Sequence, residues 1–156
     1  MDEQAGQIVR FPMALALEQA RAASVRGEVP VGAAVLAPDG TLLASAGNQI
    51  QALHDASAHA ELLAMRAAAA RIGSPRLAGC TLVASLEPCP MCAGAASHFR
   101  IARLVFGAYD AKGGGVEHGP RLFAQPGCLH RPIVSGGVRE AESAALLREF
   151  FENRRG

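Results

Sequence analysis

Two short segments far apart in the chain carry the residues that most restrict how it can fold. The first, Ala-His-Ala-Glu, contains His59 and Glu61, and the second, Pro-Cys-Pro-Met-Cys, contains Cys89 and Cys92. One imidazole and two thiolates suit zinc, and three such ligands leave a fourth coordination position for water. If these residues bind one ion, the fold must bring the two segments together.

Helical and strand patterns alternate along the chain. We expect helices at 13–26, 58–72, 88–99 and 140–153, and strands at 31–36, 41–46, 81–85, 104–108 and 133–134. The turn sequence Pro-Asp-Gly at 38–40 joins the first two strands into a hairpin. This order predicts an α/β fold of the three-layer α/β/α type, with a central mixed sheet of about five strands, largely parallel after the hairpin. Both metal-binding segments then follow a loop and open a helix.

Details of the helices follow from side-chain spacing. We expect Ser57 to cap the second helix, because a serine side chain can accept a hydrogen bond from an unpaired N–H of the first turn. Spacings of three and four residues predict two buried stripes. Their members are Leu62, Met65, Ala69 and Ile72 in the second helix, and Ala144, Leu147 and Phe151 in the last.

The composition limits the class of protein. A chain of 156 residues, half of them hydrophobic, is long enough for one core, so we expect a single domain over residues 1–156. No apolar run is long enough for a membrane helix, and the N-terminus does not resemble a signal peptide. We therefore expect a cytoplasmic protein, in which Cys80 and Cys128 are free thiols. The formal net charge of +1 is not that of a strongly basic nucleic-acid binder.

The residue types indicate hydrolytic chemistry. We expect His59, Cys89 and Cys92 to hold one zinc ion per chain and Glu61 to move protons for an activated water. His-x-Glu combined with Pro-Cys-x-x-Cys is the signature of zinc-dependent nucleobase deaminases. A noncatalytic module with structural zinc is a second interpretation, although such a site normally has four protein ligands. A Cys-x-x-Cys pair alone is also compatible with redox chemistry.

Further segments extend the pattern beyond the metal ligands. They are Glu28–Ala33, Gly47–Asn48, His54–Asp55, Leu86–Gly94, Phe106–Lys112 and Leu146–Phe151. With these segments the chain resembles the bacterial tRNA adenosine deaminases of the cytidine-deaminase-like superfamily, from about residue 13 to residue 155.

The resemblance implies a homodimer that converts adenosine to inosine at the wobble position of a tRNA anticodon stem-loop. It implies that Asn48 forms hydrogen bonds with the flipped base, that His59 and Val31 lie against the faces of the base, and that Asp110 and Lys112 contact neighbouring nucleotides. The substrate-binding residues that follow from it are Asn48, Val31, Ala60, Asp110 and Lys112.

One departure from the family keeps an alternative open. Gln49-Ile50 follows Asn48, where the family usually has an arginine followed by proline or threonine. The loss of this arginine removes a candidate phosphate contact or a structural salt bridge. Together with the nearly neutral charge, it leaves room for a deaminase of a free nucleobase, nucleoside or nucleotide, of the guanine or cytosine type.

Overall fold

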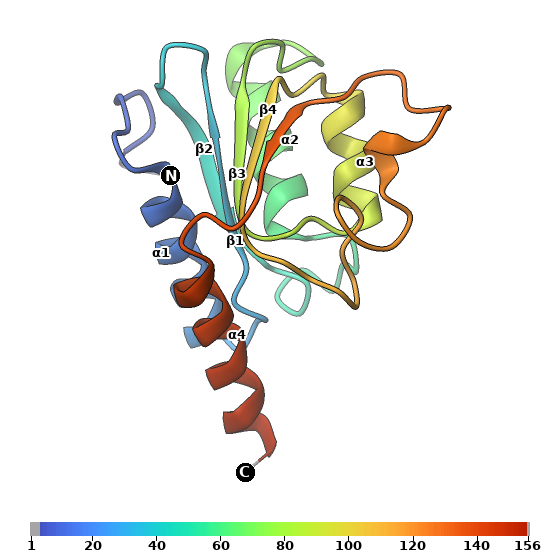
Figure 1. Ribbon diagram of the computed structural model, residues 1–156. Coiled ribbons are helices and arrows are strands. Elements are labelled where there is room, and N and C mark those ends of the chain that lie inside the picture. Colours follow the sequence, from blue (N-terminus) through green and yellow to red (C-terminus); the bar gives the residue numbers. More distant parts are fainter. Residues whose placement is uncertain (1–3, 156) are drawn as a thin grey trace.

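The computed structural model describes residues 4–155, so residues 1–3 and 156 of the predicted single domain lie outside the described part. The helices and strands follow one another in the predicted order (Figure 1). They are α1 (Pro12–Val25), β1 (Gly32–Leu36), β2 (Leu42–Gly47), α2 (Ala60–Ile72), β3 (Thr81–Leu86), α3 (Pro90–His98), β4 (Arg103–Ala108), the 3-10 helix η1 (Leu122–Ala124), β5 (Ile133–Ser135) and α4 (Glu140–Arg155).

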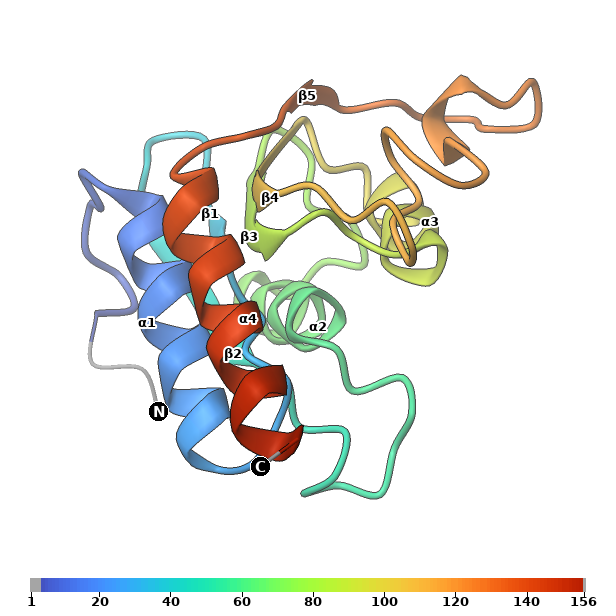
Figure 2. The ribbon, with the colours of Figure 1, turned by 60° about the horizontal axis from the view of Figure 1, so that its bottom comes forward.

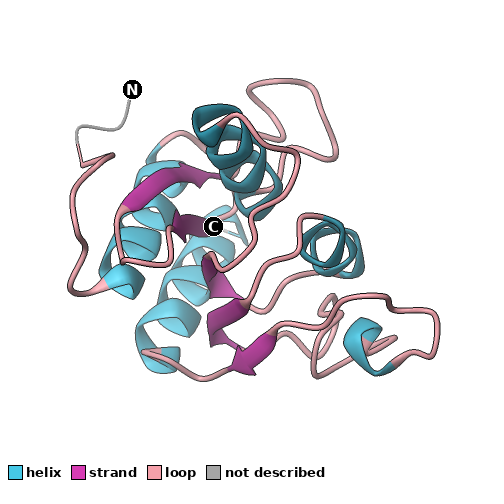
Figure 3. Cartoon of the chain, turned by 90° about the horizontal axis from the view of Figure 1, so that it is seen from above, coloured by secondary structure: helices cyan, strands magenta, loops and turns pink. Residues whose placement is uncertain are grey.

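The strands form one mixed sheet in the order β2-β1-β3-β4-β5. β1 is antiparallel to both β2 and β3, whereas β3, β4 and β5 run parallel to one another. Figure 3 shows helices on both sides of these strands. The predicted α/β/α fold with a mixed sheet of about five strands is therefore confirmed.

Helices cover each face of the sheet as a pair. α1 and α4 lie side by side on one face, and α2 and α3 lie on the other (Figure 2). Successive side chains of β3 point to opposite faces of the sheet, because side chains alternate along a strand. Leu82 belongs to the core under α2 and α3, and Val83 to the smaller core under α1.

The close approach of α1 to β1 depends on small residues. A Cβ atom on Gly32 would lie 2.6 Å from the backbone nitrogen of Ala20, and it would also overlap the carbonyl oxygen of Ala16. Both atoms belong to the backbone of α1, so they cannot move aside as a flexible side chain would. The alanines and the glycine together fix the distance between this helix and the sheet.

Three details of the sequence prediction were wrong. The Ser57 hydroxyl donates a hydrogen bond to Asp55 instead of capping α2, which begins one residue after His59. The buried side of α2 is formed by Ala60, Glu61, Ala64, Met65 and Ala68, while Ile72 is 44% exposed. In α4, Phe150 is buried and Phe151 is 47% exposed.

No helix of the described residues is both long and apolar enough to cross a membrane.

Candidate metal centre and active site

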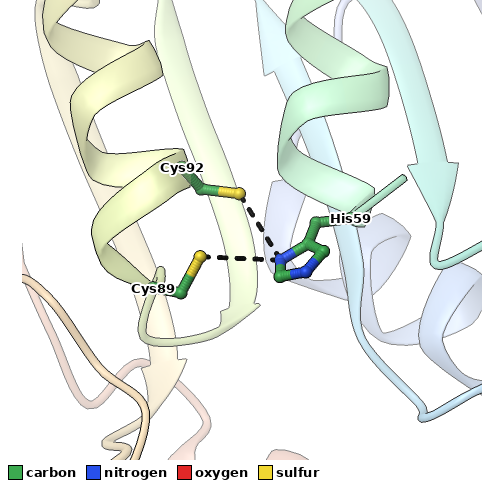
Figure 4. Close-up of side chains that lie close together, drawn as sticks. All are labelled: His59, Cys89 and Cys92. Carbon is green, nitrogen blue, oxygen red and sulfur yellow. Dashed lines mark hydrogen bonds between the residues drawn. The ribbon is translucent and has the colours of Figure 1, made fainter. Parts of the chain in front are cut away.

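The three predicted metal ligands meet where two helices begin. His59 is the N-cap of α2 and Cys89 is the N-cap of α3, and Cys92 lies in the first turn of α3. The Nδ1 atom of His59 lies 3.6 Å from the Sγ atom of Cys89 and 3.7 Å from that of Cys92 (Figure 4). Neither N-cap side chain forms a capping hydrogen bond, so both remain available as ligands.

The electrostatics of the cluster favour thiolate at Cys89. A hydrogen bond from the Cys92 thiol and the neighbouring His59 ring lower the pKa of Cys89 to about 4. The same shared proton, together with burial, raises the pKa of Cys92. The hydrogen bond with Cys89 also raises the pKa of His59. A divalent cation in this position would replace the shared proton, and Cys89 and Cys92 would hold it as thiolates.

Glu61 lies beside the cluster without belonging to it. Its side chain is buried, and no group of the described residues forms a hydrogen bond with its Oε1 atom. Burial raises the pKa of Glu61 to about 7. A buried carboxylate oxygen without a partner is rare and points to a ligand or a catalytic role. Glu61 is therefore positioned to exchange protons with whatever occupies the space next to it.

Metal binding by this cluster is supported by the nature of its donors. Their ligand atoms all lie within 4.8 Å of one another, and within residues 4–155 no fourth His, Cys, Asp or Glu joins them. Three ligands of N and S type match a catalytic zinc site, which keeps one position open, better than a closed structural one. The unpartnered Glu61 oxygen is the second feature that such a site requires.

Asn48 forms hydrogen bonds with two of the other predicted substrate residues, Val31 and Ala60. Its Oδ1 atom accepts a hydrogen bond of 2.8 Å from the backbone N–H of Ala60, and its Nδ2 atom donates one of 3.2 Å to the carbonyl of Val29. The backbone N–H of Asn48 donates to the carbonyl of Val31. The structure thus brings Asn48, Val31 and Ala60 together next to His59. The hydrogen bond to Val29 uses one of the two amide hydrogens of Asn48.

Asp110 and Lys112 lie on the loop that follows β4. Oδ1 of Asp110 accepts hydrogen bonds from the backbone N–H groups of Lys112 and Gly113, which makes a tight turn. The Lys112 side chain is exposed. The loop then continues across the start of α3, where the N–H of Gly115 donates to the carbonyl of Pro88.

Two buried glutamates that the sequence analysis did not single out hold the loops around the cluster. The Glu28 carboxylate accepts hydrogen bonds from the backbone N–H groups of Gln51 and Ala52, just after Asn48. Burial alone raises the pKa of Glu28, but these donors outweigh it, and the pKa lies below the ordinary value of 4.5. Glu87 holds the loop after β4 in the same way. Glu28 lies shortly before β1 and Glu87 shortly before α3. This position next to an element of the site was the signal in the sequence that could have identified them.

Comparison with known proteins identifies the family. Residues 8–108 match the model of the cytidine and deoxycytidylate deaminase zinc-binding region, which is more than half of the chain. The chain belongs to this deaminase family. The deaminase is 51% identical to a tRNA-specific adenosine deaminase of Agrobacterium fabrum, over 92% of its own length and 93% of that relative. The resemblance inferred from the sequence is confirmed.

Solved structures show the same fold with two different substrate classes. A structure from a study of A-to-I editing by tRNA:A34 deaminases at the wobble position of transfer RNA has a TM-score of 0.86 and 49% identity. That match covers 87% of the deaminase and 98% of the solved chain. A guanine deaminase from Nitrosomonas europaea has a TM-score of 0.79 and 27% identity, covering 93% and 87% of the two chains.

The family match and the donor set agree on the metal. The deaminase binds one zinc ion per chain, as the sequence analysis predicted. Cys80 and Cys128 are free thiols, also as predicted. A closed structural site would need a fourth protein ligand, and none joins the cluster in the described part of the chain.

Proposed function

We propose that this deaminase hydrolyses adenosine to inosine at the wobble position of a tRNA anticodon stem-loop. The observation that carries the proposal is a three-ligand cluster beside a buried carboxylate oxygen without a partner. Support for the substrate comes from the 51% identity to a tRNA-specific adenosine deaminase over nearly the full length of both proteins.

In the proposed mechanism, His59, Cys89 and Cys92 hold the zinc ion. Bound zinc supplies Lewis acidity that lowers the pKa of a water from ~16 toward ~7. Glu61 accepts a proton from the water that attacks C6 of the adenine, and it delivers that proton to the neighbouring ring nitrogen. It then takes the remaining proton of the hydroxyl group added at C6 and carries it to the amino group as the C6–N bond breaks. The products are inosine and ammonia.

The substrate contacts are proposed from the same arrangement. The remaining amide hydrogen of Asn48 is available for donation to an acceptor atom on the edge of the base. Val31 and Ala60 then form the adjacent wall of the substrate site. Lys112 is exposed and carries the positive charge that suits a phosphate group. We assign contacts with nucleotides on either side of the reacting base to Asp110 and Lys112.

We further propose that the deaminase is a single domain over residues 1–156 and works as a homodimer in the cytoplasm. The support for the dimer is the resemblance to the bacterial enzymes. The support for the location is a tRNA substrate. Light scattering at several protein concentrations tests the dimer, because a mass equal to one chain at all of them contradicts it.

A second candidate is deamination of a free nucleobase. The observation in its favour is the TM-score of 0.79 with a guanine deaminase at 27% identity. Gln49 also stands where the family usually has the arginine that would contact a phosphate. This candidate differs from the first only in the substrate, because the zinc ligands and Glu61 serve both.

Ammonia release from defined substrates separates the two candidates. The purified protein is incubated with an anticodon stem-loop that carries adenosine at the wobble position and, in parallel, with guanine, cytosine and adenosine. A stem-loop with guanosine at the wobble position is the matched control. We expect inosine only in the first RNA. If ammonia is released only from the small molecules, the second proposal replaces the first.

A further inference from the structure

The carboxylate of Glu87 is surrounded by backbone N–H groups of one loop. Oε1 accepts a hydrogen bond of 3.0 Å from Asp110, and Oε2 accepts hydrogen bonds of 3.2, 2.9 and 3.1 Å from Val116, Glu117 and His118. The Nδ1 atom of the His118 ring lies 2.8 Å from Oε1. Glu87 is only 2% exposed, so water does not compete for these donors.

The same loop is packed onto the backbone that carries a zinc ligand. A Cβ atom on Gly114 would lie 2.5 Å from Oε2 of Glu87, and one on Gly115 would lie 2.5 Å from the nitrogen of Pro90 and 2.9 Å from the carbonyl carbon of Cys89. Only glycine allows these approaches. Residues 110–118, which we call the 110–118 loop, therefore touch both the carboxylate and the first residues of α3.

Without the carboxylate this loop would keep the turn at Asp110 and the hydrogen bond from Gly115 to the carbonyl of Pro88, but residues 116–118 would lose their hydrogen bonds to Glu87. It contains three consecutive glycines, 113–115, and glycine loses the most conformational freedom when it is ordered. The four N–H groups that point at Glu87 are directed inward, and each would lose its partner. Glu87 is also two residues before Cys89, so a short rigid piece of chain connects the loop anchor to the metal ligand.

We propose that Glu87 is a positioning residue, which fixes the 110–118 loop relative to Cys89 and thereby determines how the deaminase holds the nucleotides next to the reacting base. This inference rests on the proposed function, because it takes Asp110 and Lys112 as the nucleotide contacts. Glu87 itself touches neither substrate nor metal. It acts by holding Asp110 through Oε1 and residues 116–118 through Oε2.

The negative charge and both oxygens of Glu87 are needed for this role. Glu87→Gln keeps the shape but turns an NH₂ group toward backbone N–H donors, so one side of the loop is released. Glu87→Asp keeps both acceptors on a side chain one methylene shorter, and the loop can follow it inward. We expect KM for the stem-loop to rise about tenfold or more in Glu87→Gln, with kcat and zinc content near those of the wild type. Glu87→Asp should recover a large part of this loss.

Hydrogen exchange of the zinc-loaded protein tests the placement directly. In Glu87→Gln the amides of Asp110, Val116, Glu117 and His118 should exchange faster, while those of α2 stay protected. Glu28→Gln is the matched control, because Glu28 is equally buried and holds a different loop. In that variant the faster exchange should be confined to the neighbourhood of Gln51 and Ala52.

The outcomes separate this inference from the proposed function. Equal protection of the 110–118 amides in the wild type and Glu87→Gln would overturn the inference whatever the substrate is. A lower melting temperature with an unchanged KM would also overturn it, since that pattern belongs to a purely structural residue. By contrast, a wild-type protein that leaves the stem-loop unchanged would refute the proposed function, and the exchange experiment would still report on the loop.

Discussion

Gly115→Ala tests how firmly the loop after β4 is seated on the metal centre. The new Cβ atom would lie 2.5 Å from the Pro90 nitrogen, whereas ordinary contacts begin at 3.4 Å, so the two segments must separate by about 0.9 Å. Zinc sites tolerate only about 0.2 Å in ligand distances, so a shift of α3 would disturb Cys89. Overpacking of this kind costs about 1–3 kcal/mol. For a domain of this size, that lowers the melting temperature by about 2–12 °C.

The assay combines thermal unfolding with competition for zinc against a chelator. We expect a lower melting temperature and a zinc affinity reduced by about 10–100-fold, as is typical for changes just outside a ligand shell. Gly127→Ala is the control, because Gly127 also lies between β4 and β5 and, apart from its chain neighbours, no atom of the described residues is within 4 Å of the new Cβ. If Gly115→Ala matches this control in melting temperature, zinc affinity and turnover, the close packing described above is wrong.

Three further predictions concern the site and its supports. Glu61→Gln should retain one zinc per chain by elemental analysis and lose about 10²–10⁴ in turnover; turnover near the wild-type value would refute its role in proton transfer. Cys89→Ala should lose zinc and melt at a lower temperature, because metal binding is coupled to folding; full zinc occupancy would show that the ligand set is different. Glu28 should stabilise the protein above its ordinary pKa of 4.5, and this contribution should disappear as the pH falls through its lower folded-state pKa. Urea unfolding at pH 7 and in acid measures this, and a wild-type advantage over Glu28→Gln that does not shrink in acid would contradict it.

The fold and the metal ligands could be predicted because their signals are local. Each strand and helix has its own apolar spacing, and turn residues such as those at 38–40 mark the boundaries. The ligand types and their spacing identify zinc without knowledge of the packing. Even so, Phe150 and Phe151 in α4 both fit an apolar stripe, and only the position of the helix on the sheet decides which of them is buried.

The two glutamates that hold the loops around the site could not be predicted in the same way. Glu28 and Glu87 read as ordinary acidic residues, because their partners are backbone N–H groups 23 to 31 residues away. Backbone groups carry no sequence signal of their own. The Ser57 prediction failed for a related reason: Asp55 lies nearby and takes the hydroxyl group in a local turn that competes with capping.

The separation of the zinc ligands along the chain has a consequence during protein synthesis. Cys89 follows His59 by 30 residues, and β3, which leads into α3, lies between them. At about 5–20 residues per second, the ribosome adds the two sulfurs about 2–6 s after the imidazole. The nascent chain therefore carries a lone histidine ligand for seconds and can capture its ion only once α3 has emerged. Gly115, which packs against the backbone of Cys89, is added later still, so the ligands are all synthesised before the segment that packs against them.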